Sequence, residues 1–204
     1  DEQGTFAVFS EQGISASHLS AGRFIDAIAH IPGNSGATSD AVGAYTQVEL
    51  GGPVTWISLP RSRRPASWTT FEEPVCILRL NLYGHPLAGL YWEQYCHTIL
   101  QKAGFTKVPG WECLFQHHEQ KLFLSVYVDD FKMAGHARNL TRMWHKLSQT
   151  LELEPPSPLH GSVYLGCGQY DATFPKSYYD IREDFYSLII DAKDQLRDSS
   201  LIPA

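Results

Sequence analysis

The stretch Leu122-Phe123-Leu124-Ser125-Val126-Tyr127-Val128-Asp129-Asp130-Phe131-Lys132-Met133-Ala134 decides the fold expected for this chain. Two apolar runs flank an acidic pair, so the pattern predicts a strand, a two-residue acidic turn and a second strand. A tight turn pushes its side chains out of the sheet, where Asp129 and Asp130 can contact a metal ion. Acidic turns without any function are also common, because aspartate bonds its own backbone.

Adjacent carboxylates at this turn repel each other, and burial would raise the pKa of at least one unless a cation shares the site. Mg²⁺ would relieve the repulsion, because it prefers carboxylate oxygens. A carboxylate-held pair of such ions is the machinery of phosphoryl and nucleotidyl transfer. The turn therefore indicates a candidate site for that chemistry, provided that a second strand supplies another carboxylate. Lys132, just past the turn, is expected to be a solvated strand residue.

Composition predicts one domain with a real core, since the chain has 204 residues, 43% apolar content and five tryptophans. No apolar run approaches the roughly 20 residues that a membrane span requires, so no membrane partner is expected. Four widely spaced cysteines read as buried thiols in a reducing compartment, which predicts an intracellular protein, cytoplasmic or nuclear. The start at Asp1, without Met, indicates a fragment.

Net charge argues against a strongly basic nucleic-acid surface, because it is −6. One basic cluster stands out, Arg61-Ser62-Arg63-Arg64. A solvated loop is its simpler role, and contact with a phosphate backbone is the sharper alternative.

Secondary-structure patterns predict helices that alternate with strands in hairpins, which favours an α+β fold with a helix-backed antiparallel sheet. Residues 34–39 are small and polar and make a poor strand. The expected helices cover residues 15–31, 87–103 (with Gly104 as C-cap) and 137–151, and the expected strands cover residues 55–59, 74–82, 111–118, 121–128 and 162–167.

Asp40 is the candidate for the further carboxylate, and Tyr45 follows it by five residues. The motifs Leu82-Tyr83-Gly84 with Trp92 shortly after, Tyr127-Val128-Asp129-Asp130 and Tyr164-Leu165-Gly166 come next, in that order. Together they resemble the reverse transcriptase of copia-type LTR retrotransposons, over roughly residues 10–168. The helix predicted for residues 15–31 is similar to the one that precedes the family's first catalytic aspartate.

The resemblance implies a right-hand polymerase palm with partial fingers over residues 1–170, then a divergent acidic tail over residues 171–204, with the thumb missing or degenerate. It implies an RNA-directed DNA polymerase that transfers nucleotides onto a primer 3′-hydroxyl. Asp40, Asp129 and Asp130 would be catalytic and would hold Mg²⁺ or Mn²⁺. The implied partners are an RNA or DNA template-primer, deoxynucleoside triphosphates and the remainder of a polyprotein.

The same resemblance implies roles for four substrate-binding residues. Tyr45 would lie under the sugar and exclude a 2′-hydroxyl, while Tyr127 and Val128 would line the hairpin near the primer terminus. Gly84 would pass beneath the template, where a residue without a side chain allows close backbone approach.

Departures from the family favour an alternative, a catalytically inactive retroelement relic that keeps the palm fold as a binding or structural module. Residues 85–91 replace the family's Lys-Gln pair and Ser-Pro, and its basic fingers strand would lie before Asp1. A zinc site is the remaining alternative. Its candidate ligands are Cys96, His97, Cys113, His117 and His118. The adjacent Cys96 and His97 would point about 100° apart on a helix. Core thiols and loop histidines therefore explain these residues more simply than a zinc site does.

Overall fold

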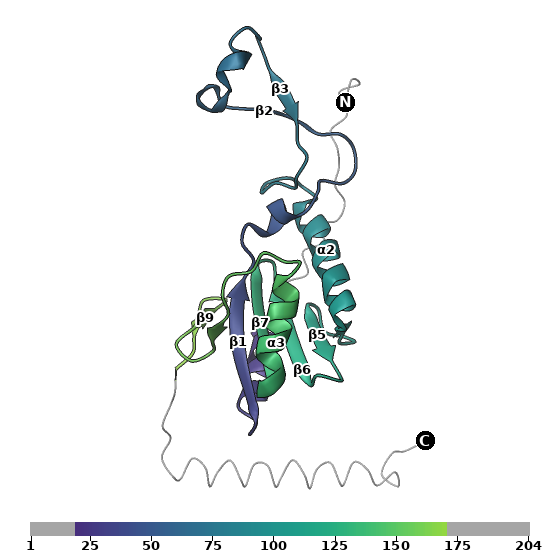
Figure 1. Ribbon diagram of the computed structural model, residues 1–204, viewed down its shortest axis with the longest axis vertical. Helices are drawn as coiled ribbons and strands as arrows, with labels where there is room; N and C mark the ends of the chain where they lie inside the picture. Colours follow the sequence, from purple (N-terminus) through teal and green to yellow (C-terminus); the bar gives the residue numbers. More distant parts are fainter. Residues whose placement is uncertain (1–18, 171–204) are drawn as a thin grey trace, which may run out of the picture. The chain divides into compact units, whose positions relative to one another are not determined.

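The computed structural model describes residues 19–170, and its centre is a six-stranded antiparallel sheet in the order β4-β5-β6-β7-β1-β8 (Figure 1). The predicted class, an antiparallel sheet backed by helices, is confirmed. The elements are α1 (Leu19–Ala29), β1 (Asn34–Asp40), η1 (Ala44–Gln47), β2 (Trp56–Ser58), η2 (Arg61–Arg63), η3 (Ala66–Trp68), β3 (Val75–Ile77), α2 (Ala88–Ala103), β4 (Thr106–Lys107), β5 (Leu114–His117), β6 (Leu122–Tyr127), β7 (Asp130–His136), α3 (Ala137–Ser148), β8 (Ser157–Pro158), β9 (Val163–Tyr164) and β10 (Cys167–Gly168).

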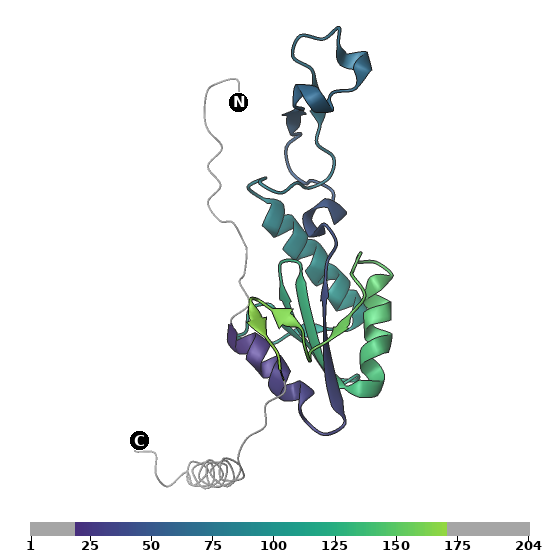
Figure 2. The same cartoon turned by 90° about the vertical axis from the view of Figure 1, so that its left-hand side faces the viewer.

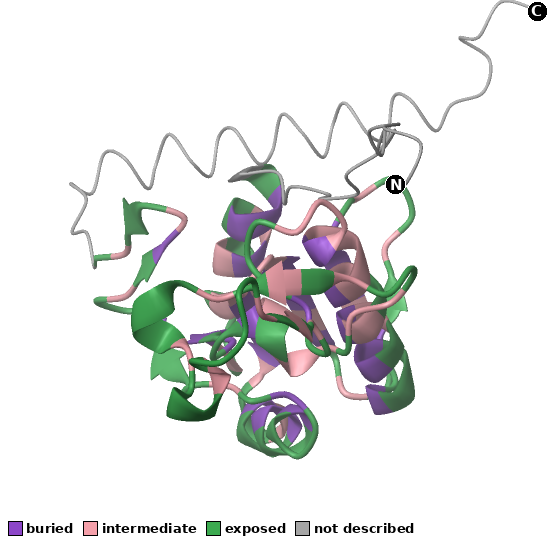
Figure 3. Cartoon of the chain, turned by 90° about the horizontal axis from the view of Figure 1, so that it is seen from above, coloured by how far each residue is buried: buried purple, intermediate pink, exposed green. Residues whose placement is uncertain are grey.

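Helices cover both faces of the sheet. α1 packs on one face, where Ile25 contacts Leu114 and Ala134 in a small apolar cluster. α2 and α3 pack on the other face over the main core, which includes Phe131 and Met133 of β7. Figure 2 shows α1 and α3 on opposite sides of the strands, and Figure 3 shows buried residues on both the helices and the strands.

β1 is the strand whose sequence pattern is least like a strand. Residues 34–39, whose small polar side chains predict a poor strand, form most of β1 between β7 and β8. Small residues are required here: a Cβ on Gly36 would lie 2.4 Å from Leu159 and 3.0 Å from Ala29. Pairing with two neighbours therefore outweighs the weak local propensity.

The hairpin between β6 and β7 is confirmed, but its tip lies one residue earlier than predicted. Tyr127 pairs with Asp130, so the two loop residues are Val128 and Asp129, and Asp130 already belongs to β7. Val128 has a φ of 53°, a conformation that a β-branched side chain rarely adopts.

Three further expectations are corrected. The strand predicted over residues 162–167 is a short hairpin, because Leu165 and Gly166 both have positive φ and turn the chain between β9 and β10. The spacing of apolar residues over 87–103 predicts a buried stripe of Leu87, Tyr91, Tyr95 and Ile99, but of these only Ile99 is buried, and the buried stripe of α2 runs through Ala88, Trp92 and Cys96. Cys167 is exposed and Cys76 half-buried, so only Cys96 and Cys113 are the buried thiols expected.

Some expectations lie outside the described residues. These are the first turn of the helix predicted from residue 15 and the acidic tail from residue 171. Among residues 19–170, no helix is long and apolar enough to cross a membrane.

Residues 50–80, which we call the arm, form a separate two-stranded sheet from β2 and β3. Leu50 N–H donates to the Arg79 carbonyl at 2.8 Å and Leu78 N–H to the Thr55 carbonyl at 2.9 Å, which joins the two halves of the arm. The segments η2 and η3 lie between these strands in sequence, at the far end of the arm from the large sheet (Figure 1).

Candidate functional site

The three predicted acidic residues come together at one end of the sheet. Asp40, the last residue of β1, lies directly opposite Asp130, the first residue of β7. Ala41 N–H donates to the Asp129 carbonyl at 2.7 Å, which ties the end of β1 to the hairpin tip. Residues directly opposite each other in an antiparallel pair point to the same face. Asp40 and Asp130 therefore share the α1 face of the sheet.

Electrostatic repulsion within this group is visible at Asp130. Burial first, then the charges of Asp40 and Asp129, raise the pKa of Asp130 to about 6. A hydrogen bond with Asp40, to which the protonated Asp130 carboxyl donates, acts in the same direction. Two carboxyl groups that share a proton carry an excess of negative charge which a divalent cation would neutralise.

The donor chemistry fits a hard cation, although the side chains are not arranged around one. As they stand, no three histidine, cysteine or acidic side chains of residues 19–170 form a group that could hold a metal ion. Binding would require the carboxylates of Asp40, Asp129 and Asp130 to turn toward a common point. Carboxylate oxygens are the ligands that Mg²⁺ prefers, and the negative charges of Asp40 and Asp129 beside Asp130 would attract such an ion.

Trp92 of α2 forms a hydrogen bond with the strained hairpin tip. This side chain is buried on α2, and its Nε1–H donates to the Val128 carbonyl at 2.5 Å. Val128 and Trp92 also line a cavity of about 40 Å³ between α2 and the hairpin, together with Tyr45 and Val126. The sequence contains Trp92 just after the Leu82-Tyr83-Gly84 motif, but only the structure connects it to the tip that carries Asp129.

Tyr45 lies within electrostatic range of the acidic group. It is part of η1 and half-buried, and its ring lies 4.5 Å from that of Tyr83. Burial first, then Tyr83, Asp129 and Tyr127, raise the pKa of Tyr45, which places its hydroxyl within electrostatic range of Asp129. Gly84 is exposed with a φ of 91°, and a Cβ there would meet no atom within 4 Å. Tyr127 is half-buried, on the same face as Asp130.

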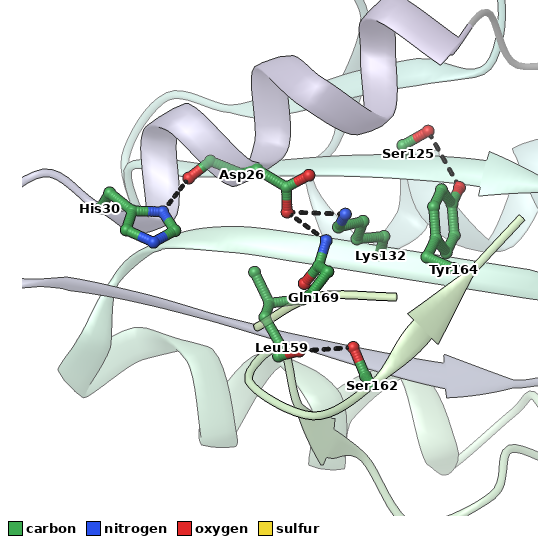
Figure 4. A network of polar contacts seen from close by, with 8 residues as sticks. All are labelled: Asp26, His30, Ser125, Lys132, Leu159, Ser162, Tyr164 and Gln169. Atoms are coloured by element: carbon green, nitrogen blue, oxygen red, sulfur yellow. Dashed lines mark hydrogen bonds and ion pairs between the residues drawn. The ribbon is translucent and has the colours of Figure 1, made fainter. Parts of the chain in front are cut away.

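Lys132 departs most clearly from its predicted place, because it is 1% exposed and not solvated. Its Nζ lies 2.7 Å from Asp26 Oδ1 of α1 and 4.8 Å from the centre of the Tyr164 ring of β9. Gln169 Nε2 donates to the same Asp26 oxygen at 2.5 Å (Figure 4). The buried ammonium therefore joins α1 and the β9–β10 hairpin to the strand that begins with Asp130.

Tyr164 completes this network on the α1 face of the sheet. Its hydroxyl lies 3.3 Å from Ser125 Oγ of β6. A Cβ on Gly22 would lie 3.3 Å from the ring of Tyr164, so α1 also packs closely against it. The pattern of the sequence could not reveal this network, since its members come from three regions far apart in the chain: α1, the β6–β7 hairpin and residues 164–169.

A polar pocket of about 310 Å³ lies on the β8 side of Asp40. Its walls come from the end of β1 and from residues 154–163, the segment that leads into β9. It is lined by Thr38, Ser39, Asp40, Glu154, Pro155, Ser157, Pro158, His160, Gly161, Ser162 and Val163. The carboxylate group therefore opens on one side into a hollow rich in hydroxyl groups.

We expect Asp130→Asn to stabilise the protein at pH 7 and not at pH 4. The folded-state pKa of about 6 is higher than the ordinary value of 3.8, so the folded chain holds this proton more tightly. Stability from this group is therefore greatest below about pH 4 and falls as the pH rises to 6. Discounting for partial exposure, the gain at pH 7 is about 1–2 kcal/mol.

Urea unfolding at both pH values measures this difference, with Glu152→Gln as an exposed control. An equal gain at pH 4 and pH 7 would show that repulsion among the carboxylates is not its origin.

No family model, curated protein or solved structure matches this chain. Its function must therefore be inferred from the motifs and from the geometry of the carboxylate site.

Proposed function

We propose that this chain is the palm, with partial fingers, of an RNA-directed DNA polymerase. The observation that supports it best is the convergence of Asp40, Asp129 and Asp130 from two neighbouring antiparallel strands. These are the residues that the resemblance to copia-type reverse transcriptases predicted, and residues 40 and 129 are distant in sequence. Mg²⁺ bound there would lower the pKa of a primer 3′-hydroxyl and neutralise charge on the leaving pyrophosphate.

The chain's own residues would position the reactants. Trp92 holds the hairpin tip through its hydrogen bond to Val128, so the backbone that carries Asp129 has a fixed place. Tyr45, stacked near Tyr83, would lie against the sugar of the incoming nucleotide. The polar pocket beside Asp40 has a volume of about 310 Å³, within the range of small-molecule sites, and would accept part of the primer terminus.

A second candidate, a non-catalytic relic, is favoured by one observation. A triphosphate binds mainly through lysine and arginine, yet Lys132, two residues beyond Asp130, is buried and paired with Asp26. Among residues 19–170, no lysine or arginine lines the polar pocket beside Asp40. A chain that cannot clamp the triphosphate would keep the fold and lose polymerisation.

Primer extension distinguishes the two candidates. We expect residues 1–204 alone to extend a labelled primer on RNA or DNA template poorly or not at all, because phosphate binding requires cationic side chains. Fusing a basic fingers segment from a copia-type relative before Asp1 should raise extension, and Asp129→Asn should abolish it. Activity that survives Asp129→Asn would contradict the proposed catalytic site.

We expect Tyr45→Ala to relax discrimination against ribonucleotides in the extended, active protein. The Tyr45 ring is half-buried and within electrostatic range of Asp129, and under the proposed function it would occupy the space that a 2′-hydroxyl needs. Discrimination, measured as the ratio of kcat/KM for deoxyribo- to ribonucleotide, should fall by about tenfold or more. Tyr83→Ala, which removes the neighbouring ring, is the control, and an equal fall in both variants would assign the effect to the pair of rings rather than to Tyr45.

A further inference from the structure

The arm exposes an unusual amount of apolar surface. Six of the twelve exposed large apolar side chains in the described part of the chain belong to residues 50–80. Trp56 is 58% exposed and Phe71 62%. Exposed apolar groups that gather in one region mark an interaction site rather than a random surface.

One face of the two-stranded ribbon collects part of this surface. Trp56 lies opposite Ile77, and Ser58 lies opposite Val75. Opposed residues share a face of an antiparallel pair, so Trp56, Val75 and Ile77 form one exposed surface, which we call the ribbon face. The alternate residues Ile57 and Cys76 are half-buried on the other side.

A hollow of about 350 Å³ lies beyond the ribbon, around η2 and η3. Arg61, Arg64, Trp68 and Phe71 contribute to its lining. Arg64 is held in place, because its Nε donates to the Leu59 carbonyl at 2.9 Å. Two guanidinium groups, two aromatic rings and one carboxylate, that of Glu72, thus surround one concave surface.

The charge of the arm indicates which kind of partner it would bind. The arm has four arginines against two glutamates, whereas the whole chain has a net charge of −6. A second copy of the arm would bring arginines against arginines, so pairing between two arms is disfavoured. The positive charge of the arm would attract a polyanion. A polyanion that also has flat apolar rings could pack against the tryptophans and Phe71 of the arm.

We propose that the arm binds single-stranded nucleic acid, with Trp56 stacking on a base and Arg61 and Arg63 contacting phosphates. The class of ligand rests on the proposed function, but binding requires no catalysis. Aromatic side chains and arginines in combination are the usual means of holding single strands without sequence preference, since every base has a face to stack. The phosphate contacts add an affinity that weakens as the salt concentration rises.

Fluorescence anisotropy with the full chain, in EDTA and without triphosphates, tests the inference. The probes are fluorescein-labelled oligo-dT and oligo-U of about 12 nucleotides, within the usual range of site sizes. We expect Trp56→Ala to weaken binding by roughly tenfold, and Trp56→Phe to retain most of the affinity. Arg61→Ala with Arg63→Ala should reduce the slope of log affinity against log salt by about 0.7 for each phosphate that the variant no longer neutralises.

Matched controls remove equivalent groups elsewhere. Arg23→Ala and Arg138→Ala each delete an exposed arginine outside the arm, and Tyr170→Ala deletes an aromatic side chain that is 79% exposed. These variants should bind as the parent does. Arm variants that bind no more weakly than the controls would overturn the proposal.

Two other results would also overturn it. In the first, the chain binds anionic phospholipid vesicles but not the oligonucleotides, and Trp56→Ala abolishes the vesicle binding. The other is a dimer in sedimentation that dissociates on the same change. These results can be told apart from failure of the proposed function. If the arm variants bind nucleic acid with normal affinity while primer extension persists, only the proposed role of the arm is rejected. If binding depends on the arm but no primer is extended, only the proposed polymerase activity is rejected.

Discussion

Asp26→Asn is expected to destabilise the folded chain by about 2–4 kcal/mol, because it leaves the buried charge of Lys132 without its counter-ion. Lys132 is 1% exposed and its Nζ lies 2.7 Å from Asp26. Loss of one partner of a buried pair costs about 3–5 kcal/mol. The expected value is somewhat lower because the Asp26 side chain is 32% exposed, which lets water compensate in part.

Lys132→Met should behave in the opposite way. It replaces the buried ammonium with an apolar chain of similar length and leaves Asp26 in contact with water, so stability should change by less than about 1 kcal/mol or increase. The double variant Asp26→Asn with Lys132→Met should recover most of the loss, which makes the coupling measurable by urea unfolding of all four proteins. Glu72→Gln on the arm is the exposed control. A loss in the double variant as large as in Asp26→Asn alone would show that the uncompensated charge is not the cause.

Asp129→Asn is expected to reduce polymerisation by the extended, active protein by about 10³-fold or more. Under the proposed function this carboxylate holds the metal ions, whose stabilisation of the transition state amounts to several kcal/mol, and each 1.36 kcal/mol corresponds to tenfold in rate. Asparagine keeps the size of the side chain and its place at the hairpin tip, so the fold should be unaffected. Single-turnover extension measures the chemical step, and Mn²⁺ binding followed by electron paramagnetic resonance measures the site directly.

The matched control is Glu154→Gln, an exposed carboxylate that lines the polar pocket beside Asp40. It removes the same charge from the same neighbourhood, and its effect on extension should be smaller by at least an order of magnitude. Equal losses in both variants would indicate that general negative charge, and not ligation by Asp129, accounts for the result.

The local sequence was sufficient to predict a helix or strand wherever its own residues show the spacing or the end signals of that element. The apolar residues over 137–151 recur at helical spacing, which predicts one buried face, and Leu140, Met143 and Leu147 of α3 are all buried. Gly104 ends α2 with a φ of 101°, as its conformational freedom predicts. The strands on either side of Asp129 were also evident, since two apolar runs around a short polar turn have few other solutions.

Part of the candidate site could also be predicted from the sequence. The resemblance carried by the motifs around Asp40, Tyr45 and Asp129 implied which side chains should meet, and the pairing of β1 with β7 brings Asp40 opposite Asp130. The role of Trp92 behind the hairpin tip was not predictable, because an indole can bond to any nearby carbonyl and only the packing of α2 selects that of Val128.

The sequence by itself thus determined the helices, the hairpin and the order of the acidic motifs. Tertiary structure alone decided that residues 34–40 form a strand between β7 and β8, that Val128 occupies the turn with positive φ, and that Lys132 is buried. The reason is common to all three. Cross-strand hydrogen bonds, close packing such as that of Gly36 against Leu159, and the ion pair with Asp26 are contacts between distant segments, and their free energies exceed local preferences that amount to about 1 kcal/mol per residue.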